Sequence, residues 1–181
     1  NHFGTRKRLL EYDDVMNSQR EVIYSRRRNA LYGERIEIDL NNIMFDYAGD
    51  FVERNEGAEF EDFKFELIRE VAVEPSFTAE EYGKFKHDEL IERIVKDIKA
   101  TTARRAKAVA DTVRSTMERI YEDRKDQLDM KMYFPLTNGH LGYNVPVELR
   151  KCKETDGAEI YRVFSKVVMF TTIDDAWREH L

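Results

Sequence analysis

Two pairs of adjacent carboxylates have the residue type and spacing that could do acid–base chemistry. They are Asp13-Asp14 near the start of the chain and Asp174-Asp175 near its end. Acid–base catalysis by such a pair needs both groups within reach of one substrate. Each pair lies in a segment with helical periodicity, where adjacent side chains point about 100° apart. We therefore interpret each pair as one solvent-exposed acid and one acid that binds a partner helix or a helix N-terminus.

The residues that usually build metal, nucleotide or nucleophile sites are few and scattered. The sequence has no Gly-x-x-x-x-Gly-Lys-Ser/Thr phosphate loop, no His-Glu-x-x-His and no Gly-x-Ser-x-Gly. The single cysteine, Cys152, forms neither an intrachain disulfide nor a zinc site by itself. The histidines lie in four separate segments, at His2, His87, His140 and His180. We expect no catalytic, cofactor-binding or metal-binding residue in this chain, and no enzymatic activity of its own.

The composition favours long helices with a large surface. Of 181 residues, 36% are charged, against roughly 25% in ordinary globular domains. The net charge of −6 argues against nucleic acid as the principal partner, because phosphate binding needs a basic surface. No stretch approaches the ~20 apolar residues that span a bilayer, so we expect no transmembrane segment. Because the sequence opens on Asn1 and stops at Leu181 within a helical pattern, we expect a piece of a longer cytoplasmic protein.

Apolar residues recur at three-, four- and seven-residue steps over most of the chain, which predicts helices. The first helix spans about residues 6–31, with Arg20 and Arg27 as gaps in its apolar stripe. Asp39 is the expected N-cap of the second helix. The helices predicted after the first cover about 40–54, 60–71, 80–85 with a Thr78–Glu81 capping box, 88–128, and Thr155 to the chain end.

Between the last two helices the hydrophobic period changes to that of strands. Residues 131–137 and 140–147 are β-prone and flank Asn138-Gly139, a dipeptide that favours tight hairpin turns. One proline in each strand restricts both strands to sheet edges. Two strands alone are marginally stable, so the hairpin needs a helix to pack on.

These elements predict a mainly α fold class: an elongated helical domain with long scaffold helices and one small β-hairpin at about residues 132–147. The last helix carries a regular stripe of bulky apolar residues, and such a stripe must be buried against something. We expect the partner to be the first helix, so that the two terminal helices form one rigid bar, or else something outside this chain.

Two stretches carry a specific family resemblance. Residues 5–24, TRKRLLEYDDVMNSQREVIY, resemble the start of the helical scaffold domain in the SecA family of bacterial preprotein translocase motors. Residues 168–181, VMFTTIDDAWREHL, are similar to the stretch with which SecA chains return to the scaffold and enter the two-helix finger. The resemblance implies a first scaffold helix at 1–31, a helical wing domain at 32–155 and a return scaffold helix at 156–181. The predicted hairpin departs from an all-helical wing.

The resemblance also implies a function for a larger protein and a narrower one for this chain. SecA couples ATP hydrolysis, with Mg, to the passage of unfolded preproteins through the SecY channel. This chain would be a structural and coupling module without a cofactor of its own. Its partners would be the remaining motor and preprotein-binding domains and, through the full-length protein, the SecY channel complex and the preprotein. The implied location is cytoplasmic, with peripheral association with the inner membrane.

The residues expected to contact other domains or partners lie on both terminal helices. They are Arg6, Leu9, Tyr12, Asp13, Asp14, Gln19, Ile173 and Trp177, and Trp177 is further expected to anchor packing against the first helix. The plain alternative is that the polar ones are only solvated. Two other functions stay open from the residues alone: a stand-alone helical module that binds a partner helix in a groove, and an enzyme with an unrecognised carboxylate site.

Overall fold

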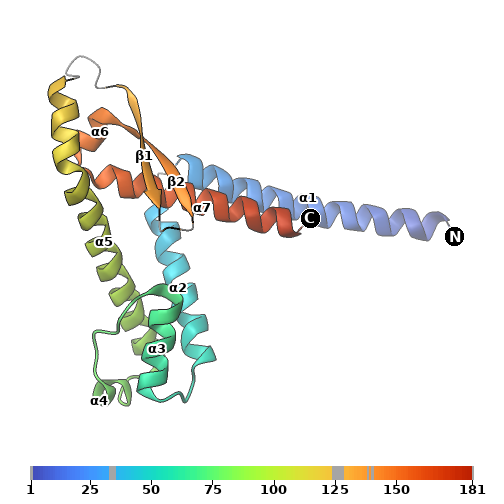
Figure 1. The fold of residues 1–181 in the computed structure, drawn as a ribbon. Helices are drawn as coiled ribbons and strands as arrows, with labels where there is room; N and C mark the ends of the chain where they lie inside the picture. The colour runs from blue at the N-terminus through green and yellow to red at the C-terminus, as the bar shows by residue number, and fades with distance from the viewer. Residues whose placement is uncertain (1, 33–35, 124–128, 138, 140, 181) are drawn as a thin grey trace.

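A computed structural model describes residues 2–32, 36–123, 129–137, 139 and 141–180 (Figure 1). The elements follow in the order α1 (His2–Tyr32), α2 (Ile36–Arg54), α3 (Phe60–Val71), α4 (Ala79–Tyr82), α5 (His87–Asp123), β1 (Lys131–Thr137), β2 (Gly142–Glu148), α6 (Leu149–Glu154) and α7 (Ala158–His180). The predicted mainly α fold with a small antiparallel hairpin is confirmed.

The two terminal helices, α1 and α7, lie side by side, as predicted, and they run in opposite directions (Figure 1). With 31 residues at 1.5 Å each, α1 is about 46 Å long. Its N-terminal part projects beyond the end of α7, while α2, α3 and the first half of α5 lie below the pair in the view of Figure 1. The molecule is therefore an arm, formed by α1 and α7, attached to a wing that contains α2 to α6.

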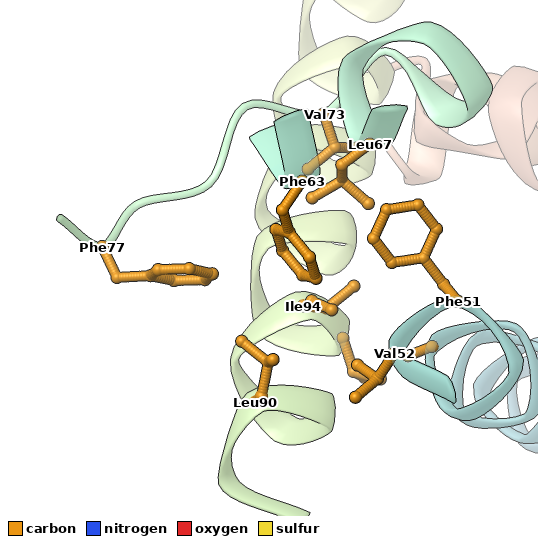
Figure 2. Packing of buried hydrophobic residues seen from close by; sticks show 10 residues of the cluster. Phe51, Val52, Phe63, Leu67, Val73, Phe77, Leu90 and Ile94 are labelled. Carbon is orange, nitrogen blue, oxygen red and sulfur yellow. The ribbon is translucent and has the colours of Figure 1, made fainter. Parts of the chain in front are cut away.

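The outer end of the wing has its own hydrophobic core, built where α2, α3 and the first half of α5 meet (Figure 2). Phe51 of α2 and Phe63 of α3 pack edge to face with ring centroids 5.1 Å apart, and Ile94 of α5 closes the contact. Each fully buried side chain of this size contributes about 1.5–3 kcal/mol. The buried members are Ala48, Phe51, Val52, Phe63, Leu67, Val73, Phe77, Leu90, Ile94 and Val95.

A second core forms at the other end of α5, where the hairpin, α6 and α7 meet that helix. Met117 of α5, Val145 of β2 and Ile160 of α7 are among its buried residues. The hairpin packs on α7, as the prediction required, and the Tyr143 and Phe164 rings meet edge to face at 5.6 Å. Helix α5 contributes to both cores, so its 37 residues join the two ends of the wing over about 55 Å.

Helix α2 begins earlier than predicted. Asp39 is not its N-cap, because the helix starts at Ile36 and Asp39 lies in its first turn. Ile36 is only 2% exposed, and its burial extends the helix by one turn. The predicted end of the long helix at 128 falls on residues 124–128, outside the described part of the chain.

The connections around the hairpin also differ from the prediction. Thr137 pairs with Gly142, so four residues join the strands, where a two-residue turn would pair Thr137 with residue 140. Asn138 lies outside the described residues, and Gly139 has a φ of +91°, the left-handed backbone that favours glycine. The short helix α6 was not predicted. Thr155 does not start the last helix as predicted, because it is the C-cap of α6 and α7 begins at Ala158, but its Oγ1 accepts the Glu159 amide of α7 at 3.0 Å.

Candidate interaction surface

The N-terminal part of α1 exposes apolar side chains over several turns. Leu9, Leu10, Tyr12 and Val15 are 57%, 64%, 62% and 54% exposed. Apolar side chains on a helix are shielded from water only where another element packs on them. Within the described chain, α7 covers only part of α1 (Figure 1). The predicted contact residues Arg6, Leu9, Tyr12, Asp13 and Asp14 all lie on this exposed part.

The contact between α1 and α7 centres on one arginine. Arg27 Nε lies 2.8 Å from Asp174 Oδ1, and Arg27 Nη2 lies 3.2 Å from Asp174 Oδ2, a two-pronged charge-assisted pair. The same guanidinium lies over the Phe170 ring, 4.9 Å from its centroid. The two charged side chains are 31% and 24% exposed, so the pair is partly shielded from solvent. It links α1 directly to α7.

The interpretation of the second carboxylate pair is confirmed. Asp174 binds the partner helix, whereas Asp175 is exposed and pairs locally with Arg178 at 2.9 Å. Asp13 and Asp14 are both exposed on α1. Neither pair brings two carboxylates to one shared site. Arg27 was not predicted as a contact residue. Its position in the apolar stripe of the first helix was the available signal, because a cation in such a stripe needs a partly buried acid on the neighbouring helix.

The other predicted contact residues are spread over both helices. Gln19 is half-buried on α1, and Trp177 is half-buried on α7, close to one turn beyond Asp174. Ile173 does not face the Arg27 contact; it lines a groove between α7 and α2. Of the predicted contact residues, the structure thus places Trp177 near the Arg27 contact and Ile173 in the groove, while Leu9 and Tyr12 lie on the exposed N-terminal part of α1. Their roles as partner contacts stay predictions.

A groove between α2 and α7 encloses about 660 Å³. Its apolar walls come from Leu40 and Ile43 of α2 and from Phe164, Val168, Met169 and Ile173 of α7. Ile43 is 53% exposed. A cavity of this size falls within the range of ligand-binding pockets, but its walls are the sides of two helices.

Cys152 is a core residue rather than a reactive one. Its side chain is buried between the hairpin and α7, and burial raises the pKa of Cys152 to about 11. The thiol is therefore protonated at neutral pH and a poor nucleophile. The adjacent Tyr121 hydroxyl donates to the Leu149 carbonyl at 2.7 Å, which ties α5 to α6.

Two further properties concern the described residues alone. Among them, no three His, Cys, Asp or Glu side chains are grouped so that they could hold a metal ion. None of the described helices combines the length and the apolar character needed to cross a bilayer.

Comparison with known families decides what kind of module this geometry belongs to. A family model described as the SecA Wing and Scaffold domain matches residues 1–181. This chain belongs to the SecA wing and scaffold family. The likeness first seen at residues 5–24 and 168–181 therefore extends through the intervening wing, including the hairpin that was expected to depart from the SecA pattern.

SecA proteins of several bacteria are similar over the whole chain. The proteins named protein translocase subunit SecA from Parabacteroides distasonis, Porphyromonas gingivalis and Flavobacterium psychrophilum are 39%, 38% and 37% identical to it. Each match covers 100% of this chain and 16% of the relative. The chain thus spans about one sixth of the length of these SecA relatives. No solved structure matches it.

Proposed function

We propose that this chain is the scaffold and wing module of a protein-translocating SecA motor, and that it couples movements of the motor domains to movement of the preprotein. The observation that carries the proposal is the Arg27–Asp174 pair. It joins α1 to α7 as one bar and leaves Leu9, Leu10, Tyr12 and Val15 of α1 exposed for other domains. The division into 1–31, 32–155 and 156–181 belongs to the same proposal.

The module would act mechanically. A helix about 46 Å long reaches several neighbouring domains. Displacement of one end is transmitted if the bar is stiff and its contacts have two alternative arrangements. The ion pair and the Phe170 contact supply stiffness between α1 and α7. The exposed side chains of Leu9 and Tyr12 supply the apolar contact with a neighbouring domain.

The chemistry would lie outside this chain. In the proposed full-length protein, ATP and Mg bind the motor domains, and the module contributes no catalytic residue. Its direct partners would be the motor and preprotein-binding domains, with the SecY channel complex and the preprotein reached through the whole protein. The protein would work in the cytoplasm, peripherally associated with the inner membrane.

Binding in trans tests this function. The purified chain is titrated with a protein that contains the remaining SecA domains, and binding is measured by light scattering or pull-down. We expect complex formation that Leu9→Glu or Tyr12→Ala weakens by about tenfold or more, because each change removes buried apolar contact. Phe65→Ala is the control, since Phe65 is 64% exposed on α3, away from α1.

Absence of a complex, or an equal loss with Phe65→Ala, would contradict the proposal. The alternative, a stand-alone helical interaction module, predicts no affinity for the motor domains. A nucleotide titration of the chain alone tests the third candidate, an enzyme with an unrecognised carboxylate site. The scaffold module and the stand-alone interaction module both predict no response to nucleotide.

A further inference from the structure

Each strand of the hairpin has one outer edge, because the described sheet consists of β1 and β2. An outer edge presents backbone N–H and C=O groups that can pair with a strand of another chain. Both strands are seven residues long and contain several β-prone residues, and the Tyr133 side chain of β1 is 67% exposed. Two such edges favour association between copies of the chain unless something blocks them.

The register of the hairpin shows which residues turn their backbone groups toward these edges. The Leu149 amide donates to the Met130 carbonyl at 3.1 Å, one step beyond the pair formed by Lys131 and Glu148. Bonded and non-bonded pairs alternate in an antiparallel ladder. The even-numbered residues of β1 therefore bond to odd-numbered residues of β2. The odd-numbered residues of β1 and the even-numbered residues of β2 direct their backbone groups outward.

Both prolines of the hairpin occupy outward-directed positions. Pro135 of β1 lies opposite Asn144, and Pro146 of β2 lies opposite Tyr133. Proline has no N–H, and its ring occupies the place of that hydrogen. At a bonded position either proline would break the ladder, whereas here the ladder loses nothing. Each outer edge instead lacks one donor and carries a ring in the path of an incoming strand.

The sequence around Pro135 explains why this edge needs such a block. Residues 132–137 read Met-Tyr-Phe-Pro-Leu-Thr and carry no charge. Uncharged segments of six or seven β-prone residues without proline are the kind that stack into intermolecular sheets. The Pro135 side chain is exposed, so packing in the core does not account for its presence. Its position fits the protection of the edge.

We propose that Pro135 and Pro146 prevent the hairpin from pairing edge to edge with the hairpin of a second copy of this chain. Pro135 protects the outer edge of β1, and Pro146 protects the outer edge of β2. The two residues thus keep an exposed hairpin from associating with other copies. This role is independent of the α1 contacts on which the proposed function rests.

Sedimentation velocity of the 181-residue chain over a range of concentrations tests the proposal. Valine is favoured in strands and restores the outward N–H, so Pro135→Val should strengthen self-association by about tenfold or more relative to the parent. Pro146→Val opens the other edge and gives a second test at a separate site. The double variant should associate most strongly, because both of its edges can pair.

The matched control is Asn144→Val, since Asn144 is exposed and lies directly opposite Pro135. It adds the same apolar side chain while both prolines stay in place, so its self-association should equal that of the parent. Addition of Tyr133→Lys to Pro135→Val should restore the behaviour of the parent, because a lysine on the edge opposes strand pairing.

Hydrogen exchange shows where the copies meet. The Tyr133 amide faces the outer edge of β1, so in Pro135→Val its exchange should slow as the protein concentration rises. In the parent its exchange rate should not depend on concentration. Circular dichroism checks that each variant keeps the helical content of the parent.

Three outcomes overturn the proposal. The first is a double variant that associates no more strongly than the parent. The second is an equal gain in association with Asn144→Val, which would assign the effect to added apolar surface. The third is association of Pro135→Val without slower exchange at the Tyr133 amide, which would place the contact elsewhere on the molecule.

Discussion

Arg27 links α1 and α7 through two kinds of contact. Its guanidinium pairs with both Asp174 oxygens and lies over the Phe170 ring. Partial burial strengthens such a pair and raises the cost of leaving one charge without the other. The two helices should therefore separate readily when either charge is removed.

Asp174→Asn should lower the free energy of unfolding by about 1–2 kcal/mol, because it leaves the Arg27 charge partly buried without its counter-charge. Asp175→Asn is the matched control, since Asp175 is exposed and pairs with Arg178 on its own helix. That control should stay within about 0.5 kcal/mol of the parent. Urea unfolding measures both variants, and equal effects would contradict the assignment of Asp174 as the interhelical acid.

Glu70 gives the wing a pH-dependent contact. It accepts bonds from Arg54 at 2.9 and 3.0 Å and from the Tyr47 hydroxyl at 2.9 Å. The hydrogen bonds from Arg54 lower the pKa of Glu70 below its usual value of 4.5. Since the folded-state pKa is the lower one, the stabilisation is complete above pH 4.5 and is lost as the pH falls through the folded-state pKa.

Glu70→Gln should therefore be less stable than the parent at neutral pH, and the gap should close as the pH falls below about 4.5. Urea unfolding at several pH values measures the gap between the two proteins. The control is Glu118→Gln, since the Glu118 side chain is exposed on α5. A gap that stays constant into the acid range would show that Glu70 contributes no pH-dependent stability.

At the scale of elements, periodicity predicted most helices and the hairpin, because each follows from its own local pattern. The α2 start was wrong because burial of Ile36, a tertiary effect, outweighed the capping preference of Asp39. The α6 helix is six residues long, too short for a periodic signal. The α1 contact with α7 was predicted as a pairing, but the sequence alone did not reveal that Arg27 would meet Asp174 across 147 residues.

Gly157, at the junction of α6 and α7, tests how closely that junction packs against α5. Its φ is +87°, and an added Cβ would lie 3.2 Å from the Ala110 Cβ of α5. Gly157→Ala should cost roughly 1–3 kcal/mol, because it adds backbone strain to crowding against α5. Thermal or urea unfolding measures the loss.

Gly49→Ala is the matched control for that glycine. Gly49 lies inside α2, where an added Cβ would be 4.0 Å from Ile91 Cδ1, an ordinary contact. This change should stabilise the protein by about 0.5–1 kcal/mol, because alanine is the better helix former. Destabilisation by Gly49→Ala, or neutrality of Gly157→Ala, would show that the α5 contacts differ from those described.

At the scale of the whole molecule, α5 connects two separate cores and the α1–α7 pair extends from one of them (Figure 1). The continuous helix α5 can carry a displacement from one core to the other, since the side chains of a packed core move together. The proposed coupling needs this property: a displacement received along α1 must reach the wing and α7 without being absorbed within either helix.

The most direct test of that coupling uses a full-length SecA protein that contains this chain. It measures the amount of preprotein translocated for each ATP hydrolysed. Asp174→Asn should lower this ratio by about fivefold or more, the factor that corresponds to about 1 kcal/mol of lost coupling, while ATP hydrolysis continues. Asp175→Asn should leave the ratio unchanged. A ratio unaffected by Asp174→Asn, or lowered equally by both changes, would contradict the account of α1 and α7 as the coupling bar.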